Sequence, residues 1–117
     1  MGDGILDTDD SALAAAGRLE AALQAYCAII AGLVQLEWKM ENYRAAADLL
    51  LQMQHAARDL PELHPEWLEV HISHFEFTHA LWEIRAAVRG IEWLNIRHAR
   101  HLGALERLRA RCVEGDW

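Results

Sequence analysis

The stretch from His64 to Arg85, HPEWLEVHISHFEFTHALWEIR, limits most strongly what this chain can fold into. On a helix, where each residue turns the chain by about 100°, its apolar side chains gather on two flanks. One flank holds Val70, Phe77, Leu81, Ile84 and Val88, and the other holds Leu68, Ile72, Phe75, Trp82 and Ala86. Glutamates recur every seven residues on the opposite side, which predicts a water-facing stripe of Glu69, Glu76 and Glu83.

A line of polar side chains runs between the two apolar flanks. This predicted seam consists of Trp67, His71, His74, Thr78, Arg85 and Arg89. Burying an unpaired polar group costs roughly 1–3 kcal/mol, and burying a charge costs more. The seam therefore needs partners in a core or subunit interface, an open cleft, or a bound ligand. We favour partners in a core or interface, and a ligand site is the alternative.

If the seam is a ligand site, residues from neighbouring helices should complete it. The apolar face of the first helix consists of Leu19, Leu23, Tyr26, Cys27, Ile30, Leu33 and Val34. Glu37 lies on the same face as Leu23, Ile30 and Leu33, so a buried Glu37 would be an obvious partner for a histidine or arginine. The candidate ligand-binding residues are then His71, His74, Thr78, Arg85, His98, Trp82 and Glu37.

The composition favours an all-α fold. At 117 residues the chain should form a single domain, residues 1–117, with residues 1–8 frayed. Apolar residues make up 53% of the chain, and only two prolines and seven glycines interrupt it. This combination predicts an antiparallel bundle of about four helices in two helical hairpins, with oligomerisation as a way to complete the core.

Charge and cysteine usage narrow the classes of partner. A formal net charge of −7 argues against a nucleic-acid-binding protein. No apolar run reaches the roughly 18 continuous residues that span a membrane, so we expect no membrane association. Cys27 and Cys112 lack metal-ligand spacing, which indicates reduced thiols in a cytoplasmic protein, although a disulfide between the terminal helices stays open. We predict no metal and no cofactor.

Helix start and stop signals divide the chain into four segments. The acidic residues Asp7–Asp10 predict the start of a first helix that runs to about Lys39. Asn42 can cap a second helix over about Tyr43–Asp59, and Pro65 suits the first turn of a third that runs to about Arg89. A break at Gly90 would fold a fourth helix back from Ile91. The alternative is one long helix that serves two interfaces and requires an oligomer.

The segment EWKMENYRAAADLLLQM resembles one helix–turn–helix of a tetratricopeptide repeat. The spacing of Tyr43, Ala46 and Leu50 matches the start of that repeat's second helix. The resemblance covers under a third of the chain, the usual tryptophan and glycine positions of the first helix are absent, and no second copy follows at the expected period. It implies a helical hairpin and no particular function.

Several histidines have spacings that could support chemistry. His71 with His74, and His98 with His101, each place two imidazoles on one helix face. A fold at Gly90 would set Trp82 opposite His98, Thr78 opposite Leu102 and His74 opposite Glu106. That register separates His71 from His98, which argues against one four-histidine metal site. Arg85, if buried, would pair with Glu37 or Glu106, and Trp93 should be exposed or covered by a partner.

The sequence contains no motif that identifies a reaction. Phosphate-binding loops, dinucleotide-binding glycines, nucleophile motifs and cysteine clusters are absent. Whether the protein is an enzyme is left open, with His71 or His74 beside Arg85 as the candidate acid–base group. We therefore predict a small protein that acts through self-association or a protein partner, with small-ligand binding or catalysis at the seam as the alternative.

Overall fold

A computed structural model describes residues 3–35 and 39–115. The fold is all-α and 89% helical, without strands in the described residues. The described residues form four α-helices and one short 3-10 helix, namely α1 Asp3–Val34, α2 Met40–Ala57, η1 Pro61–Leu63, α3 His64–Arg85 and α4 Ile91–Glu114. Glu37 lies outside the described residues.

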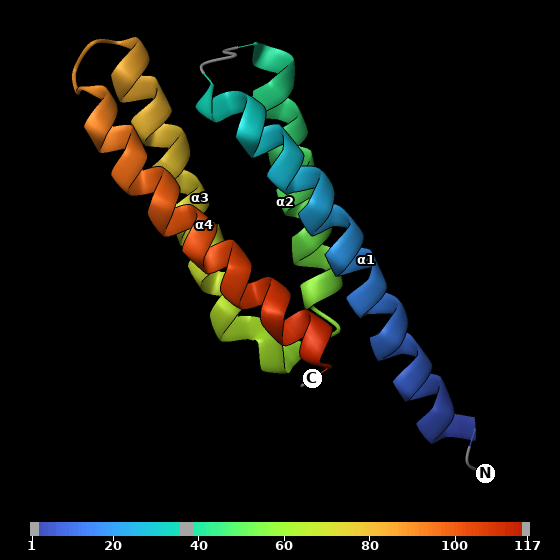
Figure 1. Ribbon diagram of the computed structural model, residues 1–117. Helices are drawn as coiled ribbons and strands as arrows, with labels where there is room; N and C mark the ends of the chain where they lie inside the picture. The colour runs from blue at the N-terminus through green and yellow to red at the C-terminus, as the bar shows by residue number, and fades with distance from the viewer. Residues whose placement is uncertain (1–2, 36–38, 116–117) are drawn as a thin grey trace.

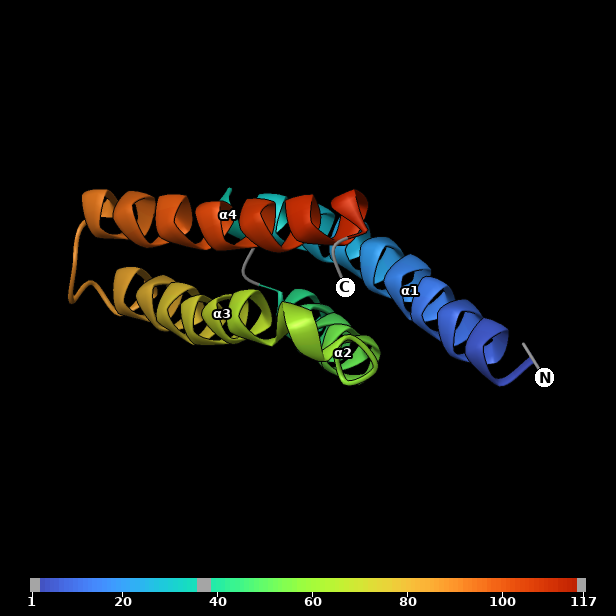
Figure 2. The same cartoon turned by 90° about the horizontal axis from the view of Figure 1, so that it is seen from below.

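The helices form two antiparallel hairpins, α1 with α2 and α3 with α4 (Figure 1). Viewed from below, α4 and the C-terminal part of α1 lie in one layer, and α3 and α2 lie in the other (Figure 2). The predicted bundle of two hairpins is therefore confirmed. The prediction of a first helix that begins at Asp7–Asp10 and runs to Lys39 is wrong at both ends, because α1 begins at Asp3 and ends at Val34.

The second helix begins earlier than predicted. Its N-cap is Lys39, which has extended backbone angles and makes no capping hydrogen bond through its side chain. The amide of Asn42 donates to the carbonyl of Lys39 at 2.9 Å, so Asn42 lies inside the first turn and does not cap the helix. α2 then ends at Ala57, before Pro61 begins η1.

The connection between α3 and α4 decides between a hairpin and one long helix. α3 ends at Arg85, and Ala87 has a φ of 59°, in the left-handed region that L-residues rarely adopt. Gly90 follows as the N-cap of α4 with an extended conformation. The reversal therefore occupies residues 86–90, and the long-helix alternative is wrong.

The core lies where the two hairpins meet. Apolar residues of α1 that share the predicted face, Leu19, Leu23, Tyr26, Ile30 and Leu33, are all buried. They meet buried side chains from the other three helices, including Met53, Phe77, Leu81, Leu94 and Leu108. Burial of this apolar surface is the main stabilising term of the fold.

The molecule is long and thin, with extents of 62 × 24 × 16 Å and a radius of gyration of 15.9 Å. A compact domain of this length would have a radius of gyration of about 13 Å. The N-terminal turns of α1 project beyond the other helices and account for part of the length (Figure 1). Much of the side-chain surface is therefore not packed against another helix of the described chain.

Within α1, the segment Ser11–Val34 is long and apolar enough to cross a membrane by length and composition. The prediction of no membrane association counted only continuous apolar residues, and Arg18 and Glu20 interrupt such a run in this segment. One such helix is weak evidence for a membrane span, because a helix in a protein core passes the same test. Here 33% of the most apolar window is buried inside the fold.

Candidate functional site

A chain of buried polar side chains joins three helices at the centre of the fold. Tyr26 of α1 has its hydroxyl 2.6 Å from Nδ1 of His74 on α3 and 2.7 Å from Nε2 of His101 on α4. On its other side, Nδ1 of His101 lies 2.5 Å from the Ser73 hydroxyl. The four residues are buried, with His101 and Tyr26 at 0% exposure. We call this group the Tyr26 network.

One set of tautomers satisfies every hydrogen bond in the Tyr26 network. His74 Nδ1–H donates to the Tyr26 oxygen, and the Tyr26 hydroxyl donates to Nε2 of His101. His101 Nδ1–H then donates to Ser73, whose hydroxyl donates to the Val70 carbonyl at 3.1 Å. The reverse direction leaves the Ser73–Val70 bond unmade. We infer the first arrangement from this proton count, because each hydroxyl has one hydrogen.

Electrostatics keep the Tyr26 network neutral. Burial, and then the nearby charge of His71, lowers the pKa of His74 to about 4. Burial, and then His74 and His98, lowers the pKa of His101 to about 3. Burial and then Cys27 raise the pKa of the Tyr26 hydroxyl. A general base works best with a pKa near the working pH, and the pKa values of both histidines lie well below neutral pH. The Tyr26 network therefore suits a structural link between helices better than an acid–base centre.

Of the glutamate stripe predicted to face water, Glu69 is exposed, Glu76 is half-buried and Glu83 is buried. The stripe borders α4, whose arginines form ion pairs with it: Arg97 with Glu76 at 3.1 Å, Arg100 with Glu76 at 3.3 Å and Arg107 with Glu69 at 3.0 Å. Arg111 pairs in the same way with the neighbouring Glu66. The seven-residue recurrence that suggested a solvated face also suits a helix facing a partner helix. The arginines of α4 are therefore balanced within the chain by acids of α3.

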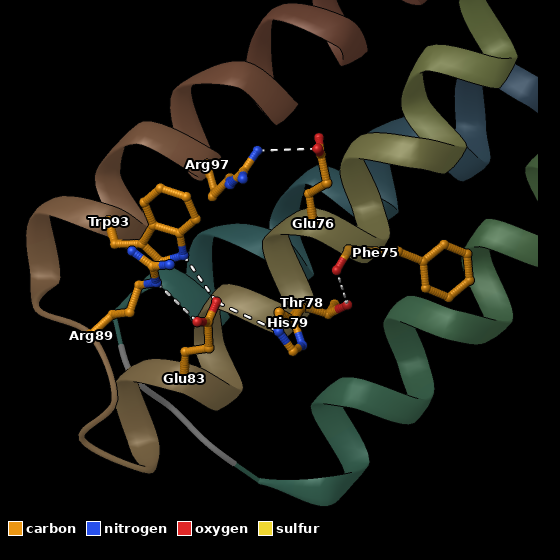
Figure 3. A network of polar contacts seen from close by, with 8 residues as sticks. All are labelled: Phe75, Glu76, Thr78, His79, Glu83, Arg89, Trp93 and Arg97. Atoms are coloured by element: carbon orange, nitrogen blue, oxygen red, sulfur yellow. Dashed lines mark hydrogen bonds and ion pairs between the residues drawn. The ribbon is translucent and has the colours of Figure 1, made fainter.

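Glu83 is the centre of a second polar cluster, near the α3–α4 connection (Figure 3). Its carboxylate accepts hydrogen bonds from Trp93 Nε1 at 3.0 Å and from Arg89 Nε at 3.1 Å, with His79 at 3.7 Å. Partial burial raises the pKa of Glu83, but the hydrogen bonds from Trp93 and Arg89 outweigh it and the pKa is lowered. The prediction that Glu83 faces water is wrong, since it is only 8% exposed.

Trp93 is neither exposed nor in need of a partner chain, contrary to the prediction. Its ring lies between two guanidinium groups, with Arg89 at 4.2 Å and Arg97 at 4.3 Å from the ring centroid. Cation–π attraction and the bond to Glu83 together hold the indole half-buried on the arginine side of α4.

The structure separates the predicted seam residues. His74 is buried in the Tyr26 network, and the Thr78 hydroxyl donates to the His74 carbonyl at 3.0 Å. His71 is half-buried, with its ring centroid 5.5 Å from Trp67 and 5.3 Å from Phe75. His98 is half-buried against Phe77, and burial lowers its pKa.

Two other candidate ligand-binding residues lie at the surface. Trp82 and Arg85 are exposed in this chain, so the core of the bundle does not enclose Arg85. The reason is that α3 ends at Arg85 and the chain leaves the bundle there. Glu106, expected opposite His74, is also exposed, and Glu37 lies outside the described residues.

The predicted pairing of α3 with α4 is displaced by about one helical turn. His74 was expected opposite Glu106, but its neighbour Ser73 contacts His101. The connection of residues 86–90 is longer than a break at Gly90 alone would give, which moves α4 along α3. The sequence therefore did not predict that Tyr26 and Ser73 both contact His101. His101 was visible only as part of a histidine pair, and Tyr26 only as a member of an apolar face.

The exposed flank of α3 is the largest departure from the predicted burial. Leu68, Ile72, Phe75 and Trp82 are 46%, 50%, 58% and 59% exposed. On the other flank Val70, Phe77 and Leu81 are fully buried, Ile84 is half-buried, and Val88, beyond the end of α3, is 62% exposed. α3 therefore has one apolar face in the core and a second that no part of the described chain covers.

Cysteines and metal-ligand residues give no separate site. Cys27 is half-buried and Cys112 buried, and the two do not form a disulfide. The Cys112 thiol donates to the Ala16 carbonyl at 3.4 Å. Across residues 3–35 and 39–115, no group of three or more His, Cys, Asp or Glu side chains could hold a metal ion.

Comparison with protein-family models, with curated proteins and with solved structures found no match. The function of the chain must therefore be argued from its own surface and polar groups.

Proposed function

We propose that the protein acts by self-association through the exposed flank of α3. The observation that carries the proposal is a spacing of four, three, four and three residues along Leu68, Ile72, Phe75, His79 and Trp82. This is the spacing of the a and d positions of a coiled coil, where each side chain packs against a facing helix. We call these five residues the α3 seam.

A second copy of the chain suits the α3 seam better than an unrelated helix. The seam is nearly symmetric in spacing about Phe75, so a two-fold axis close to Phe75 would lay it antiparallel on its own copy. One turn holds the polar His79, and a single polar position in such a seam favours one register over others. A second layer of helices would also thicken a molecule that is only 16 Å across in its thinnest direction.

Charges beside the α3 seam favour the same arrangement. The border toward α4 carries both signs, because Glu69 and Glu76 alternate with the exposed guanidinium groups of Arg100 and Arg107. Two such borders that meet across a two-fold axis can place the acids of one copy near the arginines of the other. Complementary borders of this kind set orientation more than affinity.

Sedimentation equilibrium at micromolar concentration tests self-association. We expect the wild-type chain to be a dimer and Phe75→Glu to be a monomer, because a buried charge at the centre of the interface costs several kcal/mol. Val113→Glu is the matched control, since Val113 is equally exposed, at 59%, on α4 and outside the seam. A monomeric wild type, or an equal effect of both substitutions, would contradict the proposal.

A further inference from the structure

A cleft lies where the start of α2 faces the end of α3. It is lined by Met40 and Tyr43 of α2 and by Trp82 and Arg85 of α3, and its volume is about 520 Å³. The two hairpins diverge toward the ends that hold these residues (Figure 1). The volume lies within the range of small-molecule sites, which are mostly apolar with a few polar groups that fix orientation.

The walls of the cleft are apolar and aromatic. Met40 is 65% exposed and Trp82 59% exposed, so both present their side chains openly. The Trp82 indole stacks on the His79 ring, with centroids 5.8 Å apart and planes 19° apart. This contact supports the indole from outside the cleft and restricts its motion. A supported ring loses less conformational entropy when a ligand stacks on it.

Arg85 supplies the positive group of the cleft. Burial raises the pKa of the Tyr43 hydroxyl, and the charge of Arg85 opposes that increase. The guanidinium therefore acts electrostatically on the side chain across the cleft, from the other hairpin. A guanidinium binds a carboxylate through two parallel hydrogen bonds and also stacks on flat rings.

We propose that this cleft binds a small aromatic monocarboxylate, stacked between Trp82 and Tyr43 with its carboxylate on Arg85. The rings of the two walls suit a flat aromatic body. Arg85 is the one cation among the described residues that line the cleft, which suits a carboxylate. The formal net charge of −7 on the chain disfavours ligands of higher negative charge. Met40, Tyr43 and Arg85 lie outside the α3 seam, but Trp82 belongs to it. A dimer formed through the seam would therefore compete with the ligand for the Trp82 indole.

Titration of the full-length protein with naphthoate tests this site, with naphthamide as the uncharged analogue. We expect naphthoate to shift the indole N–H resonance of Trp82 and the amides near Tyr43, and naphthamide to bind at least about tenfold more weakly. Trp82→Phe assigns the indole resonance. A spectrum unchanged by naphthoate, or equal binding of the two compounds, would overturn the proposal.

Two substitutions distinguish binding at this cleft from nonspecific binding elsewhere on the protein surface. Arg85→Gln should weaken naphthoate binding about tenfold or more while naphthamide binding stays the same. Arg18→Gln is the matched control, because Arg18 lines a second large groove, between α1 and α2, and should leave binding unchanged. Both arginines are exposed, so both variants should fold. Equal losses in the two variants, or shifts centred on the α1–α2 groove, would reject the assignment. Phe75→Glu disrupts the α3 seam and leaves every lining residue of the cleft in place. This variant should bind naphthoate at least as tightly as the wild type, and loss of binding in it would also overturn the proposal, whatever the outcome of the dimer test.

Discussion

At the scale of single residues, the Tyr26 hydroxyl performs the task that most distinguishes this fold from a purely apolar bundle. It accepts a hydrogen bond from one buried imidazole and donates one to another, and thereby links α1 to both helices of the second hairpin. Removing such a group leaves two buried nitrogen atoms without a partner. An unsatisfied buried polar group costs about 1–3 kcal/mol, more than the hydrogen bond itself contributes.

Tyr26→Phe should therefore lower the free energy of unfolding by about 3 kcal/mol, as measured by urea denaturation at neutral pH. Tyr43→Phe is the control, since Tyr43 is half-buried and outside the network, and it should cost less than about 1 kcal/mol. If both variants lost the same small amount, the two histidines would have to find other partners when the hydroxyl is removed.

The sequence could predict the burial of individual residues but not their partners. Tyr26 was correctly placed on the apolar face of its helix, and His74 among buried groups. Periodicity assigns a side chain to a face of its own helix and contains no information about which residues of another helix lie opposite. The same periodicity placed Arg85 between two apolar flanks, but at this helix end the bundle no longer covers that face and Arg85 is exposed.

At the scale of helices, type and approximate extent were predictable, whereas ends and faces were less so. Pro65 and Gly90 marked the start of α3 and α4 correctly, because each has a specific backbone role. The glutamate stripe of α3 was assigned to water although it faces arginines of α4. A stripe of charges at helical spacing is compatible with solvent or with an oppositely charged helix, and only the tertiary fold distinguishes the two.

The α3–α4 connection contains a residue that glycine would suit better. Ala87 has a φ of 59°, where a Cβ atom is strained. Ala87→Gly should stabilise the protein by about 1 kcal/mol, because relief of that strain outweighs the greater freedom of glycine in the unfolded chain. Ala86→Gly is the control, since Ala86 has a φ of −81° and should lose about 0.5 kcal/mol. Thermal unfolding of both variants measures these changes in stability. An Ala87→Gly variant less stable than the wild type would contradict the prediction that Ala87 is strained.

At the scale of the whole molecule, the Tyr26 network lies between the two hairpins and makes their union sensitive to pH. The ordinary pKa of histidine is 6.5, and in the fold it falls to about 4 for His74 and about 3 for His101. Below pH 6.5 the unfolded chain thus binds protons that the folded chain excludes. Stability rises with pH wherever the unfolded state binds more protons, so it must fall as the solution is acidified.

We expect the free energy of unfolding to be constant above about pH 7 and to fall between about pH 6.5 and pH 4. Each histidine should contribute a slope of up to about 1.4 kcal/mol per pH unit, for a total loss on the order of 3 kcal/mol from each. Urea denaturation across this range measures the slope. His55→Gln, which changes an exposed histidine, should leave the profile unchanged. A flat profile down to about pH 5 would mean that the folded chain also takes up these protons, and that solvent reaches the hydroxyl of Tyr26.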